Sequence, residues 1–90
     1  MPLFLIKRNF GNITEEELGA KASTSKKVCS NMPGVTWVRS YLALENDEKI
    51  TYCIYDAPDA ETAKKQAKDA GLPADEIIPL EAEIDPDTVQ

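Results

Sequence analysis

The stretch from Val35 to Asp59 constrains the fold more than any other part of the sequence. It contains two runs rich in β-branched and aromatic residues, joined at the polar dipeptide Asn46-Asp47. Two such runs on either side of a polar turn are typical of a β-hairpin. A two-residue turn also sets the register, because residues then pair where their numbers add up to the same value.

This register predicts which side chains of the hairpin share a face. Tyr41 is expected opposite Tyr52, and Arg39 opposite Ile54. Since side chains alternate along a strand, Trp37 is expected on the same face as these four residues. Both faces of the hairpin carry many apolar groups, so we expect both to be covered.

A strand and a helix are predicted before the hairpin. Pro2 to Phe10 is the strand, because its apolar run is continuous. Thr14 and Glu17 have the spacing of a capping box, which predicts that a helix starts there. Pro33-Gly34 ends this helix. The residues at helical spacing that are expected to face inward are Leu18, Ala22, Ser25, Cys29 and Met32.

A second helix and a last strand are predicted after the hairpin. Asp59 suits the N-cap of a helix, and Gly71 suits the position just beyond its end. The stripe of small residues that would let this helix lie close to a sheet consists of Ala60, Ala63, Ala67 and Ala70. The last strand is predicted from Asp75 to Ile84, and Pro79 favours an edge position for it because proline lacks a backbone donor.

The predicted order of elements is β-α-β-β-α-β, which is the ferredoxin-like arrangement of an α+β domain. It places two helices on one face of a four-stranded antiparallel sheet. Residues 1–90 are expected to form one such domain, with an acidic tail from about residue 85. The other face would expose Trp37, Tyr41, Tyr52 and Ile54, which predicts a homodimer whose sheets face each other around a cavity, as in a dimeric α/β barrel.

Composition excludes several classes of function. The net charge is −6, which argues against nucleic acid or an anionic membrane as a partner. The longest apolar run, Leu3 to Ile6, is too short for a membrane span or an export signal, so a cytoplasmic location is expected. Cys29 and Cys53 are expected as buried, reduced thiols. The absence of histidine excludes histidine-based catalytic triads and the commonest ligand of transition metals.

Three segments together resemble a family of small bacterial ferredoxin-like proteins of unknown function, one branch of which is described as nickel-binding. The segments are Trp37–Tyr41 (WVRSY), Tyr52–Pro58 (YCIYDAP) and Ala70–Asp75 (AGLPAD), the last followed by Ile77. The resemblance covers nearly the whole chain. It implies a dimeric α/β-barrel-like domain and, for the nickel-binding branch, a metal held by histidines and water.

The resemblance also implies that many relatives carry histidines at the positions of Arg8, Arg39 and Gln66. This chain has none of these histidines, and a guanidinium has no lone pair to offer a metal. We therefore predict no metal ligands, and nickel remains implied by the resemblance alone. Two arginines and an amide instead predict an anion site, because the guanidinium fork matches a carboxylate or a phosphate.

The predicted pocket binds a small anionic or aromatic molecule at the dimer interface. Its residues are Arg8, Trp37, Arg39, Tyr41, Tyr52 and Gln66. A different role stays open for Arg39, which would instead pair with a carboxylate of the partner chain at the dimer seam. If Arg39 binds the ligand, the dimer should persist in Arg39→Ala and only ligand binding should be lost.

Three functions follow as hypotheses. The first is a non-catalytic ligand-binding or sensory domain that uses this pocket. The second is a cofactor-free oxygenase or isomerase, which the dimeric barrel fold suggests by analogy. The third is a metal-binding protein like the relatives, with ligands limited to cysteines and carboxylates. No catalytic residue is predicted, because the sequence shows no paired carboxylates, no nucleophile beside a base and no phosphate loop.

Overall fold

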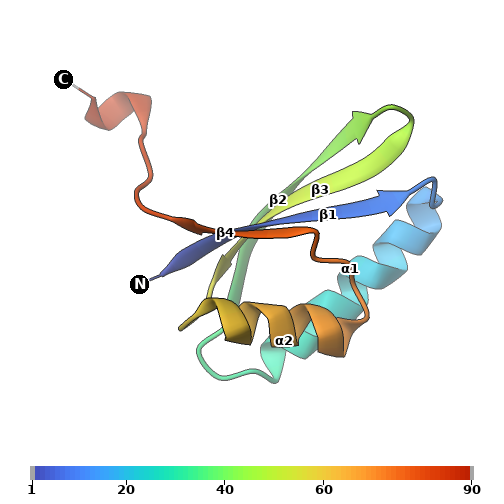
Figure 1. The fold of residues 1–90 in the computed structure, drawn as a ribbon, viewed down its shortest axis with the longest axis horizontal. Coiled ribbons are helices and arrows are strands. Elements are labelled where there is room, and N and C mark those ends of the chain that lie inside the picture. The colour runs from blue at the N-terminus through green and yellow to red at the C-terminus, as the bar shows by residue number, and fades with distance from the viewer. Residues whose placement is uncertain (1, 90) are drawn as a thin grey trace.

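The computed structural model describes residues 2–89, without the side chain of Thr88. The elements in chain order are β1 (Leu3–Gly11), α1 (Glu15–Ser30), β2 (Thr36–Glu45), β3 (Glu48–Asp56), α2 (Ala60–Ala70), β4 (Glu76–Leu80) and a short 3-10 helix (Pro86–Thr88). The four strands form one antiparallel sheet in the order β2-β3-β1-β4, and both helices cover the same face of it (Figure 1). The predicted ferredoxin-like α+β fold is confirmed.

The hairpin of β2 and β3 has the predicted turn and, over most of its length, the predicted register. Asn46 and Asp47 have φ values of 52° and 64°, the left-handed conformation that a two-residue hairpin turn requires. Tyr41 lies opposite Tyr52, as predicted, and Arg39 lies opposite its expected partner on β3. The turn chemistry therefore determines the pairing of the two strands.

The predicted position of Trp37 is wrong. The register shifts between Trp37 and Arg39, so that Trp37 pairs with Tyr55. The extra residue, Val38, forms a β-bulge, and a bulge reverses the alternation of side chains on its strand. Trp37 therefore lies on the face of the sheet that the helices cover, opposite to the face of Arg39.

The last strand is shorter than predicted. β4 ends at Leu80 rather than at Ile84, although its edge position is confirmed. The reason is the length of its neighbour, since Leu80 already pairs with Leu3, the first residue of β1. Residues 81–89 leave the sheet as an extended arm that runs away from the helices (Figure 1).

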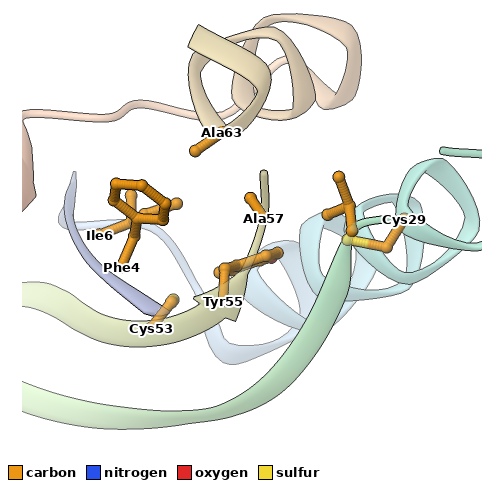
Figure 2. Packing of buried hydrophobic residues seen from close by; sticks show 8 residues of the cluster. Phe4, Ile6, Cys29, Cys53, Tyr55, Ala57 and Ala63 are labelled. Atoms are coloured by element: carbon orange, nitrogen blue, oxygen red, sulfur yellow. The ribbon is translucent and has the colours of Figure 1, made fainter. Parts of the chain in front are cut away.

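The hydrophobic core lies between the helices and the sheet. Phe4 and Ile6 project from β1 toward Ala63 of α2, whose small side chain lets the helix approach (Figure 2). Cys29 of α1 and Cys53 of β3 are both buried free thiols, as predicted. Within residues 2–89, neither helix combines the length and the hydropathy that crossing a bilayer requires.

The capping box of α1 is present. The Thr14 side chain accepts a hydrogen bond of 3.0 Å from the backbone N–H of Glu17, and the Glu17 carboxylate accepts one of 3.0 Å from the backbone N–H of Thr14. These bonds lower the pKa of Glu17 below its ordinary value. The box satisfies two donors at the helix start that have no partner within the helix.

We expect Thr14→Ala to lower the free energy of unfolding by about 1 kcal/mol, because it removes the N-cap acceptor. Thr24→Ala is the matched control. Thr24 lies exposed within the same helix and donates only to the backbone carbonyl of Ala20, so its loss should be neutral or slightly stabilising. Urea denaturation of both variants measures the difference, and equal effects would contradict the capping role.

Candidate functional site

A cavity of about 140 Å³ lies between α1 and the sheet. We call it the inner cavity. Its walls come from β1, α1, β2, β3 and the segment after α2, and the residues that line it are Arg8, Phe10, Leu18, Lys21, Ala22, Ser25, Trp37, Ser40, Thr51, Cys53, Tyr55 and Leu72. Small side chains on the inward face of α1 leave this space. Larger residues at those positions would fill it.

Arg8 is the most unusual residue of the inner cavity. Only 1% of it is exposed, because it follows Phe4 and Ile6 on the inward face of β1. Its guanidinium donates to the backbone carbonyl of Pro73 at 2.8 Å and to Oε1 of Gln66 at 3.2 Å. These bonds hold the guanidinium in place and use two of its five N–H groups.

A buried polar network continues from Gln66. Its amide nitrogen donates to Ser25 Oγ at 3.0 Å, and Ser25 Oγ shares a hydrogen bond of 2.8 Å with the Tyr55 hydroxyl. The Arg8 guanidinium also lies 5.5 Å from the centre of the Tyr55 ring, within the range of a cation–π contact. The network therefore joins β1, α1, β3 and α2 around the inner cavity.

Burial is the largest influence on the pKa of two groups at this site, the Tyr55 hydroxyl and the Cys29 thiol. It raises the pKa of the Tyr55 hydroxyl above its ordinary value, although the bond to Ser25 and the charge of Arg8 act in the opposite direction. Burial also raises the pKa of the Cys29 thiol. Both groups are therefore protonated at neutral pH, and neither supplies a negative charge to balance Arg8.

The charges that line the inner cavity have one sign. Arg8 and Lys21 are cations, and no carboxylate is among the lining residues that the structure describes. Lys21 lies near Glu17 and contributes to the lowered pKa of that carboxyl. Arg8 has no carboxylate within 4.0 Å in the described part of the chain, where the ion pairs join Lys64 to Glu61 and Lys65 to Asp69.

The opposite face of the sheet, which we call the open face, carries the remaining predicted site residues. Tyr41 is 58% exposed, and Arg39 lies beside it on this face. A hydrogen bond with the Tyr41 side chain and the charge of Glu83 raise the pKa of Arg39. The Tyr52 hydroxyl donates to the carboxylate of Glu45, which raises the pKa of Tyr52.

A groove of about 370 Å³ lies between the open face and the first residues of the arm. Arg39 and Tyr41 line it on the sheet side, and Glu81 and Glu83 line it on the arm side. This groove contains both a cation and carboxylates. Both signs of charge therefore line this groove, with two carboxylates to one guanidinium, unlike the inner cavity.

The six predicted site residues thus fall into two groups on opposite faces of the sheet. Arg8 and Trp37 line the inner cavity and Gln66 is bonded to Arg8 on the same face of the sheet, whereas Arg39, Tyr41 and Tyr52 lie on the open face. The predicted convergence of both arginines on one pocket is wrong. Arg8 and Arg39 point to different faces because Arg8 pairs with Thr51, whereas Arg39 pairs with Ile54, and Thr51 and Ile54 point to opposite faces of β3.

The sequence analysis did not assign Ser25, Tyr55 or Lys21 to a site. A signal for one of them was available, because Ser25 is the one hydroxyl in the inward stripe of α1 and needs a buried partner. Alternation along β1 likewise pointed Arg8 inward, two residues after Ile6. The bulge that brings Trp37 to the cavity left no comparable signal.

The donor set of the inner cavity does not fit a nickel ion. Nickel prefers imidazole nitrogen among protein ligands, and the chain contains no histidine. Cys53 is the only thiol among the described lining residues, and the charges of Arg8 and Lys21 repel a cation. Within residues 2–89, no three cysteine, aspartate or glutamate side chains lie together as a metal site would need, the acidic arm included.

Comparisons with known proteins agree with the fold. The family model described as nickel responsive protein SCO4226-like matches residues 4–80. A crystal structure of SCO4226 from Streptomyces coelicolor A3(2) is similar to the chain, with a TM-score of 0.69 and 24% sequence identity over 89% of this chain and 99% of that one. At this identity the structural likeness shows the fold alone. No curated protein matches.

We expect Ser25→Ala to lower the free energy of unfolding by about 2 kcal/mol, because it leaves the buried Tyr55 hydroxyl and the Gln66 amide short of a partner. Ser30→Ala is the control on the same helix, since Ser30 is exposed and bonds only to a backbone carbonyl. Its effect should stay within about 0.5 kcal/mol. Urea denaturation compares the two variants, and a Ser25 effect no larger than that of Ser30 would contradict the network.

Proposed function

The chain belongs to the SCO4226-like family of nickel-responsive proteins, and we propose that it is a non-catalytic binding domain for a small organic anion. The anion occupies the inner cavity and pairs with Arg8. The residues that line the cavity, and not the family description, indicate the kind of ligand.

The observation that carries the proposal is the buried charge of Arg8 beside the inner cavity. A buried guanidinium is costly unless an opposite charge or several hydrogen bonds compensate it. The carbonyl of Pro73, the amide oxygen of Gln66 and the ring of Tyr55 compensate part of this cost. An anion in the inner cavity would supply the missing charge, and a low dielectric would strengthen that pairing.

The other two functions have less support. An oxygenase or isomerase needs a proton acceptor at the reacting atom, and the described lining of the inner cavity contains no carboxylate or imidazole. The Tyr55 hydroxyl does not serve as a base at neutral pH, because burial raises its pKa. The family description suggests nickel binding, but Arg8 and Lys21 make the inner cavity cationic and the chain has no histidine to bind the metal.

We further propose that the open face is the interface of a homodimer. Exposed apolar side chains support this role, since Val38, Tyr41 and Ile78 are 43%, 58% and 40% exposed. A two-fold axis would bring the same surface of each chain together. Arg39 of one chain would then lie near the carboxylates of the partner's arm. Within one chain, the charge of Glu83 already acts on Arg39 and raises its pKa.

We expect small carboxylates to raise the melting temperature of the protein through Arg8. A ligand present at about 100 times its dissociation constant adds about 2.7 kcal/mol, which corresponds to a shift of roughly ten degrees or more for a domain of this size. The measurement is a set of thermal melts with acetate, hexanoate, benzoate and inorganic phosphate. Each variant is compared with its own ligand-free melt.

Lys7→Gln is the matched control for Arg8→Gln. Both substitutions remove one positive charge from β1, but Lys7 pairs with Tyr52 and lies on the open face. The ligand-induced shift should persist in Lys7→Gln and disappear in Arg8→Gln. If no anion shifts the melt, or if Arg8→Gln responds like the wild type, the proposed function is wrong.

We expect the wild-type chain to sediment at about twice the 9.9 kDa of one chain, and Tyr41→Lys to sediment as a monomer. A lysine among the apolar side chains of this interface would be desolvated without a partner of opposite charge. Leu44→Lys is the control, because Leu44 is 69% exposed but lies on the other face of β2. Sedimentation equilibrium at micromolar concentration distinguishes these states, and a monomeric wild type would refute the interface.

A further inference from the structure

We infer that the ligand of the inner cavity is a monocyclic aromatic carboxylate, that is, one flat ring with a single acidic group. This inference rests on the proposed function, which requires only a small organic anion. It adds the class of ligand, and it draws on the size of the cavity, the shape of its walls and the number of its charges.

The size of the cavity sets the size of the ligand. Its volume is about 140 Å³. An apolar cavity of about 150 Å³ in an engineered protein accommodates benzene. The inner cavity therefore has room for one six-membered ring with a small substituent.

The shape of the walls favours a flat ring. Trp37 and Tyr55 lie nearly parallel, with an angle of 6° between their planes and 6.3 Å between their centroids. Phe10, Leu18 and Leu72 complete an aromatic and aliphatic lining. A ligand ring can pack against these faces in offset or edge-to-face contact, which aromatic groups prefer. A flexible aliphatic chain of similar volume would lose more conformational freedom on binding.

The number of charges favours a monoanion. Arg8 lines the cavity, is 1% exposed, and has its guanidinium held in place by Pro73 and Gln66. The planar guanidinium fork matches the geometry of a carboxylate. A phosphate has more charged oxygens to satisfy, and most of the remaining wall is carbon, so its desolvation would be only partly repaid. A carboxylate on a ring matches the one fully buried charge of the cavity, because the second cation of the lining, Lys21, is only half-buried and stays partly hydrated.

The protein contains its own reporter for this ligand. Trp37 is the only tryptophan of the chain and lines the inner cavity, so its fluorescence should change when the cavity fills. We would titrate the full chain with benzoate, its neutral analogue benzamide, acetate, inorganic phosphate and 2-naphthoate. We expect benzoate to bind at least tenfold more tightly than each of the other four.

Two alanines of α1 test the location without touching the side chains of the polar network. Ala22 lines the inner cavity, whereas Ala20, half a turn earlier, is exposed and lies outside the lining. Ala22→Leu should fill the cavity and weaken benzoate binding at least tenfold, and Ala20→Leu should leave it unchanged. Arg8→Gln should remove the preference for benzoate over benzamide, if the variant folds. The Ala22 test stands even if that variant does not fold.

The outcomes separate this inference from the proposed function. Acetate, phosphate or 2-naphthoate binding as tightly as benzoate, with sensitivity to Ala22→Leu, would overturn the ligand class and leave the anion-binding function in place. Equal binding of benzamide and benzoate would show that charge is not recognised and would overturn both. Both would also be overturned if none of the five compounds bound, or if binding survived Ala22→Leu.

Discussion

The burial of one guanidinium determines how the interior of this protein is organised. Arg8 is a charged residue at a position that alternation along β1 assigns to the core, and the surrounding chain is arranged to satisfy it. The carbonyl of Pro73 and the amide oxygen of Gln66 accept hydrogen bonds from Arg8, and Ser25 Oγ in turn accepts one from the Gln66 amide nitrogen. Both helices are thus tied to the sheet by directional bonds as well as by apolar contact, and such bonds define one arrangement where packing of small residues alone would allow several.

The same arrangement explains why a cavity persists in so small a domain. The inward face of α1 offers Ala22 and Ser25 where a typical core helix would offer larger aliphatic residues. Ser25 cannot be exchanged for leucine without breaking the bonds to Gln66 and Tyr55. The polar network therefore restricts how far the core can be filled. In consequence, the space beside Arg8 is a product of the network and is lined by it.

The sequence predicted most of the fold because the decisive signals are local. The turn at Asn46-Asp47 and the capping box at Thr14 each depend on a few adjacent residues, and both are present. The site was predicted less well, because its geometry depends on register. One bulged residue, Val38, moves Trp37 to the other face of the sheet. Without that information, six side chains of suitable chemistry were assigned to one pocket, which the structure divides between two faces.

Because Arg8 and Arg39 lie on opposite faces of the sheet, the nickel binding that the family description suggests has to be judged for the inner cavity by itself. The buried Arg8 disfavours a divalent metal in the same cavity, because like charges repel each other and a guanidinium offers no lone pair. The inner cavity, with Arg8 and Lys21 and no carboxylate in its described lining, is electrostatically suited to the opposite charge. The sheet and helices that this chain shares with its family therefore do not by themselves specify a ligand, and the chemistry of this cavity has to be argued from the side chains that line it.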